Sequence, residues 1–356
     1  MRRFWSPAFQ EMRPYVAGEQ LAIPGLVKLN TNENPYPPSP RVLAAIRAAA
    51  NADLRLYPDP EGQPLKQALA KRHGLAVDEV FVGNGSDEVL ALAFLGLLRQ
   101  PRPILFPDIT YSFYPVYCQL FGIAYDNPPL GAGFEIRIED YRRDNGGIVL
   151  ANPNAPTGRA LDRTALRRLL QHNTESVIIV DEAYVDFGAD SVVPWIREFP
   201  HLLVIQTLSK SRALAGLRVG FAFGDSNLID ALRVAKDSFN SYLLDRLAIV
   251  GAVAAIEDED YFEETRQRII ASRARLTREL EVLGFSVIPS CTNFVFATHP
   301  RHDGAKLQAE LRRRHVLVRH FAKPRIDQHL RISVGTDAEC DTLLKHLADI
   351  LKGISP

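Results

Sequence analysis

The amino-acid sequence predicts an α/β fold of two domains, in which helices cover both faces of a mostly parallel sheet and a smaller α+β domain follows. Three observations support this prediction. The chain has 356 residues, which is roughly two domains at about 150 residues each. From about residue 80 to residue 245, short apolar runs alternate with amphipathic segments, as in parallel sheets that are buried on both faces. Beyond residue 245, long helical segments and separated strands replace this alternation.

The N-terminal part of the chain is expected to form an arm and two helices. Residues 1–35 are polar, contain prolines and show weak periodicity, so we expect an arm on the surface of a larger body. Ser39 is suited to cap the Ala-rich helix that follows it, and a second helix is predicted over residues 63–73. The large domain is expected to span residues 36–245, although residues 36–60 could also pack with the smaller domain.

The large domain is predicted from strand-like runs, most of which precede a helical segment. An unbroken apolar run of this kind indicates a buried strand, and the amphipathic segment after it indicates a covering helix. The pairs are VFV with SDEVLALAFLGLL, PILF with TYSFYPVYCQLF, GIVLA with LDRTALRRLLQ, and RVGFAF with SNLIDALRVA, while VIIV and LLVIQT precede loops.

The C-terminal domain, residues 246–356, is predicted to be α+β. Its last helix opens with a capping box, in which the side chains of Thr336 and Glu339 satisfy each other's backbone amides. A long helix is expected over DEDYFEETRQRIIASRARLTRELEVLG, and strands are expected at FSVIP, NFVFAT, VLVRHF and LRISVG.

Composition and charge favour a protein that acts on small molecules. Lysine plus arginine and aspartate plus glutamate both number 42, without the basic excess typical of nucleic-acid or membrane-surface binding. Cys118, Cys291 and Cys340 are too scattered for a disulfide framework or a zinc site, as expected for free thiols in a reducing cytoplasm. No apolar segment follows the N-terminal MRRFWSPAFQEM, and no run reaches the ~18 apolar residues of a membrane span, so we expect neither a signal peptide nor a transmembrane helix.

Ligands of open α/β sheets bind at the carboxyl ends of the strands, so the residues after each apolar run are candidate site residues. VFV is followed by GNGSDE (83–88), where glycines permit close backbone approach and the amides of a helix N-terminus attract phosphate. The same residues would also serve as an ordinary helix cap. They form no P-loop, and Glu88 stands where a dinucleotide-binding motif has its third glycine. An NAD-dependent enzyme, which would use Asp108 as its ribose ligand, remains an alternative.

Three charged residues accompany the later strands. Asp181 ends VIIVD, where an acid could hold a metal, cap a helix or pair with a cationic ring nitrogen, and an ATPase is excluded because a Walker A loop is missing. Lys210 follows LLVIQTLS, where desolvation can free an amine to attack carbonyls, although it could also simply begin a surface loop. Arg218 opens the next strand and is suited to a bidentate contact with phosphate.

Together these residues fit one ligand, pyridoxal 5'-phosphate (PLP). It presents a phosphate for the glycine-rich turn and Arg218, a pyridine nitrogen for Asp181 and an aldehyde for Lys210. Tyr111 and Tyr184 could flank its flat ring. An acid at the ring nitrogen keeps the ring protonated, so that the ring can accept the electron pair released when a bond to the substrate Cα breaks.

The chain also resembles a known family, the fold-type I PLP-dependent aminotransferases of class I/II, and within them the histidinol-phosphate aminotransferases. The resemblance extends from KLNTNENPYP (28–37) to LRISVG (330–335). The matching blocks between them are LYPDPEG, GNGSDE, TYSFYP, NPNAPTG, DEAYVDF, TLSKSRALAGLR, KDSFNSY and NFVF. Several such blocks in order, at family spacing, are a highly specific signal.

The resemblance implies a role for each matching residue at the cofactor. Lys210 would hold the aldehyde as an imine and then act as the general base. Asp181 would pair with the pyridine nitrogen, Tyr184 would contact the phenolic oxygen of the ring, and Tyr111 would stack on the ring. The phosphate would be held by the amides of Gly85, Ser86 and Asp87, together with Ser209 and Arg218.

Further implied roles concern the second subunit and the substrate. Tyr57 of LYPDP would reach the phosphate in the neighbouring subunit, which implies a homodimer. Arg331, with Arg319 nearby, would bind the substrate carboxylate or phosphate. Tyr15 and Asn32 of the arm would close over the substrate.

The loop NPNAPTG departs from the family pattern. Many relatives have asparagine directly before Pro-Thr-Gly, and its amide bonds the ring oxygen of the cofactor. Here that position is Ala155. Either Asn154 takes over this hydrogen bond, or Tyr184 serves the oxygen alone.

The resemblance implies an amino transfer between L-histidinol phosphate plus 2-oxoglutarate and imidazole-acetol phosphate plus glutamate, a step of histidine biosynthesis. An aromatic aminotransferase and a threonine-phosphate decarboxylase share the cofactor residues and are the nearest alternatives. An NAD-dependent oxidoreductase is a remote alternative. A non-enzymatic PLP-binding regulator is equally remote, because it would carry a DNA-binding module where this sequence has only an arm.

Overall fold

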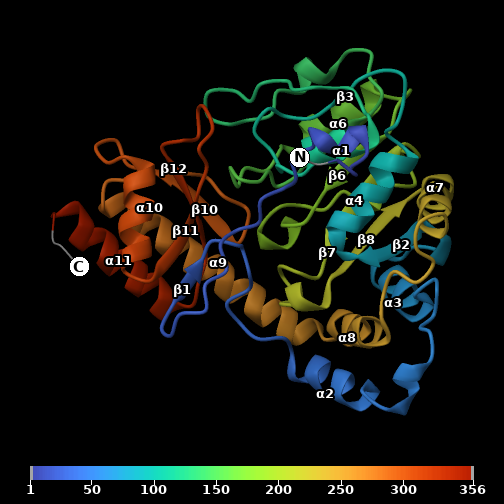
Figure 1. Ribbon diagram of the computed structural model, residues 1–356, viewed down its shortest axis with the longest axis horizontal. Coiled ribbons are helices and arrows are strands. Elements are labelled where there is room, and N and C mark those ends of the chain that lie inside the picture. Colours follow the sequence, from blue (N-terminus) through green and yellow to red (C-terminus); the bar gives the residue numbers. More distant parts are fainter. Residues whose placement is uncertain (1–2, 354–356) are drawn as a thin grey trace.

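Two β-sheets, each with its own hydrophobic core, form the framework of the molecule (Figure 1). The computed structural model describes residues 3–353. The first two residues of the predicted arm and the last three of the predicted C-terminal domain lie outside this described part. Within it, the large sheet has the strand order β2-β8-β7-β6-β5-β3-β4 and the small sheet the order β1-β11-β12-β10-β9.

The large sheet confirms the predicted α/β architecture. Strands β7, β6, β5, β3 and β4 are parallel, whereas β8 is antiparallel to both of its neighbours. The register pairs Ala151 with Asp181 and Asp181 with Ile205, so the loops after β5, β6 and β7 emerge side by side. The strands are β2 (Val80–Asn84), β3 (Ile104–Leu105), β4 (Tyr125–Asp126), β5 (Ile148–Ala151), β6 (Ile178–Asp181), β7 (Leu202–Thr207) and β8 (Val219–Gly224).

Helices bury both faces of this sheet, because successive strand side chains point to opposite sides. On β5, Ile148 and Leu150 belong to one core and Val149 to the other. One face is covered by α4 (Gly85–Gly96), α5 (Tyr114–Phe121) and α7 (Ser226–Asp237). The other is covered by α3 (Gln63–His73), α6 (Arg163–His172) and α8 (Arg246–Glu257), with α2 (Pro40–Ala49) packed on α8.

The small sheet and its helices form the second core. Its strands are β1 (Val27–Leu29), β9 (Ser286–Ile288), β10 (Phe294–Thr298), β11 (Val316–His320) and β12 (His329–Ser333). The long helix α9 (Glu259–Val282) reaches from this core to α8 (Figure 1). Helices α10 (Gly304–Arg313) and α11 (Asp337–Leu351) complete the layer, and α11 has the predicted capping box at Thr336 and Glu339.

The predicted arm is not a surface segment along its whole length. After the short helix α1 (Pro7–Gln10), residues Val27–Leu29 form β1, which is parallel to β11. Figure 1 shows this N-terminal strand beside the C-terminal strands of the small sheet. Sequence periodicity could not reveal this, since a strand of three residues is too short to show a pattern.

The division into two domains near residue 245 stays a prediction. The packing of α8 favours a domain boundary after Glu257, at the end of that helix. Ala248, Ile249 and Ala252 of α8 lie in the core of the large sheet. Helix α2, which could have joined the smaller domain, packs on α8 instead.

Short 3-10 helices join several of these elements, and no described helix is both long and apolar enough to cross a membrane. The 3-10 helices are η1 (Ala52–Arg55), η2 (Val77–Glu79), η3 (Ile138–Tyr141), η4 (Val185–Phe187), η5 (Val193–Trp195) and η6 (Ala215–Leu217).

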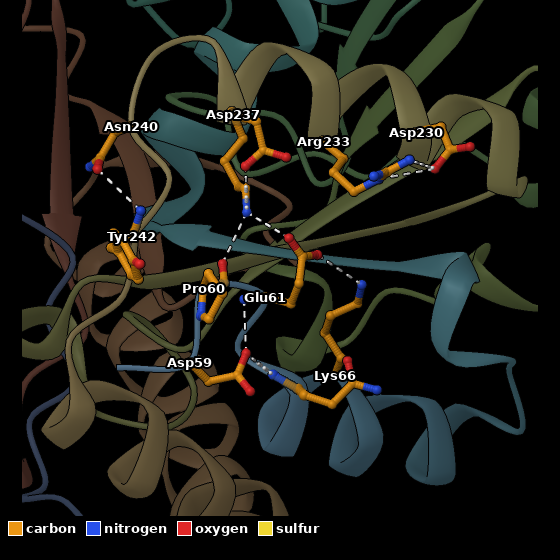
Figure 2. A network of polar contacts seen from close by, with 11 residues as sticks. Asp59, Pro60, Glu61, Lys66, Asp230, Arg233, Asp237, Asn240 and Tyr242 are labelled. Carbon is orange, nitrogen blue, oxygen red and sulfur yellow. Dashed lines mark hydrogen bonds and ion pairs between the residues drawn. The ribbon is translucent and has the colours of Figure 1, made fainter. Parts of the chain in front are cut away.

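A buried lysine fixes the turn that follows Tyr57. Lys236, near the end of α7, is 2% exposed, and its Nζ donates to Glu61 Oε1 at 2.7 Å and to the Pro60 carbonyl oxygen at 3.0 Å. Figure 2 shows Glu61 at the centre of this network, with Lys66 on one side and Asp237 on the other. The turn is therefore held to α7.

Candidate active site

A cavity of about 540 Å³ lies where the loops after β5, β6 and β7 face the small sheet and the N-terminal segment. This is the carboxyl edge of the parallel strands, where the sequence predicted the site. The cavity brings together most of the predicted site residues, namely Tyr15, Asn32, Ser86, Asp87, Tyr111, Asp181, Tyr184, Ser209, Lys210, Arg218, Arg319 and Arg331.

The N-terminus of α4 forms a cradle that only glycines permit. A Cβ on Gly85, which has φ +81, would lie 2.4 Å from Arg218 Nη2, and a Cβ on Gly220 would lie 2.2 Å from the Ser86 nitrogen. The cap residue Asn84 gives the first turn of α4 no side-chain hydrogen bond, so the amides of that turn remain available to an anion. Arg218 Nη2 lies beside the cradle, 3.1 Å from Asp87 Oδ2.

Asp181 ends β6 inside the cavity and is 5% exposed. Its carboxylate accepts hydrogen bonds from Tyr114 Oη at 2.9 Å and from the Ala183 nitrogen at 3.1 Å. Burial raises the pKa of Asp181 to about 6 despite these two bonds. A cation beside this carboxylate would reverse that shift. Tyr114 was not among the residues predicted from the sequence, because nothing in the pattern of its helix distinguishes it from a packing residue.

Lys210 follows β7 and turns its side chain into the same cavity. Its Nζ lies 3.4 Å from the Thr31 carbonyl oxygen and 5.7 Å from the centre of the Tyr184 ring. The loop that carries it is tied down on both sides. Asn34 Nδ2 donates to the Lys210 carbonyl oxygen at 3.0 Å, and Ser211 Oγ donates to Asp186 Oδ2.

Tyr184 follows β6 and is oriented by the N-terminal segment. Asn32 Nδ2 donates to Tyr184 Oη at 3.0 Å, and the Tyr184 ring meets Phe294 edge-on at 5.2 Å. Asn32 is 1% exposed and has φ 56, in the left-handed region. The sequence predicted that Asn32 closes over the substrate, and the structure adds this contact with Tyr184.

Two arginines of the small sheet lie side by side in the cavity. Arg319 on β11 and Arg331 on β12 are direct cross-strand partners, and both line the cavity. Like charges in such positions repel. Arg331 Nη2 donates to the Asn30 carbonyl oxygen at 3.0 Å, but its buried Nε has no hydrogen-bond partner. Burial lowers the pKa of Arg331. An anion bound here would reduce the repulsion between the two arginines and offset the cost of burying the Arg331 charge.

Aromatic side chains form one wall of the cavity. Tyr111 Oη donates to Asp87 Oδ1 at 2.7 Å, which holds its ring beside the α4 cradle. Tyr15 of the arm stacks on Phe113 at 4.7 Å between ring centroids. The arm therefore reaches the cavity, as the sequence predicted.

Three predicted cofactor residues do not line this cavity, namely Gly85, which opens the α4 cradle, Asn154 and Tyr57. Asn154 bonds the loop that follows β3, where its Nδ2 donates to the Ile109 carbonyl oxygen and its Oδ1 accepts from Thr110 Oγ1. Ala155 lines the cavity in its place. Tyr57 is 79% exposed and stacks on Tyr242 at 4.6 Å, outside the cavity of its own chain.

The described residues do not form the sites expected for the alternative ligands, NAD and a metal ion. Asp108, the expected ribose ligand of an NAD-dependent enzyme, pairs with Arg325 at 2.8 Å and accepts from the Leu130 nitrogen, away from the α4 cradle. Among residues 3–353, no cluster of three or more histidine, cysteine, aspartate or glutamate side chains could hold a metal ion.

Comparison with known proteins identifies the family. The model of the family "Aminotransferase class I and II" matches residues 24–347. The chain belongs to this family. The aminotransferase is 63% identical over 353 residues to histidinol-phosphate aminotransferase 1 of Methylococcus capsulatus, with 99% of each chain covered. It is 61% identical to histidinol-phosphate aminotransferase 1 of Bradyrhizobium diazoefficiens, over 99% of this chain and 100% of the relative.

Solved structures support the fold of the aminotransferase. The histidinol-phosphate aminotransferase from Sinorhizobium meliloti, solved in complex with pyridoxal-5'-phosphate, superposes with a TM-score of 0.87 at 26% identity and covers 98% of both chains. A Thermus thermophilus aspartate aminotransferase mutant superposes with a TM-score of 0.83 at 21% identity. The second likeness shows that the fold is shared.

Proposed function

We propose that this aminotransferase uses PLP to convert L-histidinol phosphate and 2-oxoglutarate into imidazole-acetol phosphate and glutamate. The observation that carries the proposal is that the cavity with Lys210 and Asp181 also has two separate groups of residues suited to bind anions, which we assign as two anion sites. One is the α4 cradle with Arg218, and the other is the Arg319–Arg331 pair. Relatives at 61–63% identity are named histidinol-phosphate aminotransferases.

The residues fit PLP at each of its functional groups. The amides of Gly85, Ser86 and Asp87, with Ser209 and Arg218, would hold the phosphate. Tyr111 would stack on the ring. When bound, PLP supplies an aldehyde for the amine and a protonated ring that withdraws electrons from the substrate Cα.

The reacting groups come from Lys210, Asp181 and Tyr184. Lys210 Nζ would remove the proton from the substrate carbon that bears the amine and deliver it to the carbon on the other side of that nitrogen, as the general base and acid of a 1,3-proton shift. Asp181 would keep the ring nitrogen protonated, and its burial excludes water from that contact. Tyr184 would donate a hydrogen bond to the ring oxygen.

The second anion site accounts for both substrates. Arg331, assisted by Arg319, would bind the phosphate of histidinol phosphate in one half of the reaction and a carboxylate of glutamate in the other, since a guanidinium matches both groups bidentately. Tyr15 and Asn32 would cover the bound substrate.

We further propose that the active unit is a homodimer in a reducing cytoplasm. Tyr57 is too exposed to serve its own cavity and would complete the phosphate site of the partner subunit. Tyr57 and Phe239 are both 79% exposed, and Tyr242 is 42% exposed. Exposed aromatic groups of this kind are typical of protein interfaces. The free thiols Cys118 and Cys340, both buried, fit a reducing compartment.

A screen of amino donors and acceptors tests the substrate. Purified protein loaded with PLP should show a kcat/KM for histidinol phosphate at least about a hundredfold above that for phenylalanine, since losing the contact with the charged phosphate costs about 3 kcal/mol. Comparable values would indicate an aromatic aminotransferase. Release of carbon dioxide from threonine phosphate would indicate a decarboxylase.

A further inference from the structure

The loop that follows β5 offers the cavity no side-chain donor near Tyr184. Ala155 lines the cavity with a methyl group, which cannot form a hydrogen bond. The two asparagines of the loop are turned to the backbone. Asn152 Oδ1 accepts from the Leu161 nitrogen at 2.8 Å, and Asn154 Nδ2 donates to the Ile109 carbonyl oxygen at 2.9 Å. The hydroxyl of Tyr184 is thus left to serve an acceptor in this part of the cavity.

The amide of Asn32 is held in one orientation. Ser333 Oγ accepts from the Asn32 nitrogen at 2.9 Å and donates to Asn32 Oδ1 at 3.0 Å. Asn293 Nδ2 donates to the Asn32 carbonyl oxygen at 3.0 Å. With Oδ1 occupied by Ser333, Nδ2 faces Tyr184 Oη at 3.0 Å. The left-handed backbone of Asn32, φ 56, is a strained conformation that surrounding contacts must maintain.

This contact determines where the hydroxyl proton of Tyr184 points. An amide N–H donates to a lone pair of Oη, so the proton of the phenol is not used in the bond with Asn32. The proton is then free for an acceptor in the cavity that Tyr184 and Lys210 both line.

We propose that Asn32 is a positioning residue, whose amide orients the Tyr184 hydroxyl as a hydrogen-bond donor to the ring oxygen of PLP, the role that Ala155 leaves unfilled in its loop. This inference rests on the proposed use of PLP. It assigns to the N-terminal segment a part in tuning the cofactor, in addition to covering the substrate.

The consequence is a defined change in the titration of the bound cofactor. A donor to the ring oxygen stabilises its negative charge, and most strongly when the neighbouring nitrogen, that of Lys210, carries no proton. Loss of the donor therefore raises the pH midpoint of the visible absorbance change of the holoenzyme. A hydrogen bond to a charged group corresponds to about 1 to 2 pH units.

The test is a pH titration of the absorbance of PLP-loaded variants. Tyr184→Phe should raise the midpoint by about 1 to 2 units, and Asn32→Ala by about half as much. In the Tyr184→Phe background, Asn32→Ala should add no further shift, because its effect passes through the hydroxyl. Ala155→Asn, which brings an amide to the cavity wall, should lower the midpoint.

The matched control is Asn30→Ala. Asn30 is another buried amide of the same segment, and its Nδ2 donates to the Glu19 carbonyl oxygen at 2.9 Å rather than to Tyr184. Its midpoint should equal that of the wild type. Besides Lys210, the charged groups of the cavity are Glu33, Asp87, Asp181, Arg218, Arg319 and Arg331, which are the same in every variant and contribute an equal background.

The outcomes separate this inference from the proposed function. An Asn32→Ala midpoint equal to that of the wild type, or an additive shift in the Tyr184→Phe background, would overturn the positioning role and leave PLP use intact. A wild-type protein that develops no visible absorbance with PLP would overturn the proposed function itself. Far-ultraviolet circular dichroism of each variant checks that the fold is retained.

Discussion

Asp181 shows how burial prepares a side chain for a ligand. The fold places a carboxylate at the end of β6 and surrounds it with only two hydrogen-bond donors, Tyr114 and Ala183. Burial raises its pKa to about 6, so the buried position favours the neutral acid more than water does. A protonated ring nitrogen would favour the carboxylate instead, which links the affinity for the cofactor to this residue.

Without PLP, the ionisation of buried Asp181 should therefore lower the free energy of unfolding of the protein above pH 6. A carboxyl whose folded pKa lies above its unfolded value contributes stability that is present below about pH 4 and lost as the pH rises through 6. Asp181→Asn should thus gain free energy of unfolding relative to the wild type between pH 4 and 7, by roughly 3 kcal/mol. Urea unfolding of both proteins at several pH values measures this difference.

Glu182 provides the matched control. Burial raises its pKa to about 7, but its carboxylate bonds Ser191, Val192 and Gln206 outside the cavity. Glu182→Gln should show a similar pH dependence without PLP and should still bind PLP, whereas Asp181→Asn should bind it weakly. A stability difference for Asp181→Asn that does not vary with pH would contradict the account.

At the scale of elements, the site depends on the close approach of α4 to β8. The backbone of β8 at Gly220 lies against the first turn of α4, where a Cβ would come within 2.2 Å of the Ser86 nitrogen. Backbone atoms cannot yield to such a contact without moving the helix, so a methyl group at this point would shift the phosphate cradle.

Gly220→Ala should weaken PLP binding by at least about tenfold, since forcing an extra methyl into a packed site costs about 1 to 3 kcal/mol. Gly216→Ala is the control, because nothing lies within 4 Å of a Cβ built there. Fluorescence titration with PLP compares the two dissociation constants. Equal values would show that the approach of the two elements does not matter for the cofactor.

The sequence predicted the long elements and the residues that follow successive strands into the site. It did not predict the contacts made by short segments. Helix 63–73 was predicted with the bounds that the structure has, because glycines flank a run that is apolar on one side. The strand β1 and the bond from Asn32 to Tyr184 depend on residues that are far apart in the chain. Neither leaves a local pattern in the sequence.

The roles of Asn154 and Tyr114 show the same limit. The motif NPNAPTG placed Asn154 at the cofactor by sequence position alone, whereas the structure turns its side chain to Ile109 and Thr157. Tyr114 belongs to an apolar helical pattern, and only the fold reveals that its hydroxyl reaches Asp181. Side-chain direction within a loop or helix is decided by tertiary packing.

At the scale of the whole molecule, the exposed position of Tyr57 makes a prediction about subunits. The turn after Tyr57 is anchored through Glu61 (Figure 2), which accepts from Lys236 Nζ at 2.7 Å. The Tyr57 ring stacks on Tyr242 at 4.6 Å. Tyr57 is therefore held at the surface, outside the cavity of its own chain, as the proposed homodimer requires.

Mixed dimers test this arrangement. Lys210→Ala and Tyr57→Ala should each lose most activity alone. Mixing them should restore about a quarter of wild-type activity, because half of the dimers are then hybrids with one complete site. Hybrids that stay as inactive as their parents, although size-exclusion chromatography shows exchange of subunits, would mean that Tyr57 acts within its own chain or not at all.

The most direct test of the account is the chemical identity of the residue that holds the cofactor. PLP-loaded protein should be reduced with borohydride, digested and analysed by mass spectrometry. The account predicts a pyridoxyl adduct on the peptide that contains Lys210, and none in Lys210→Ala. A wild-type protein without this adduct, or with the adduct on another lysine, would contradict it.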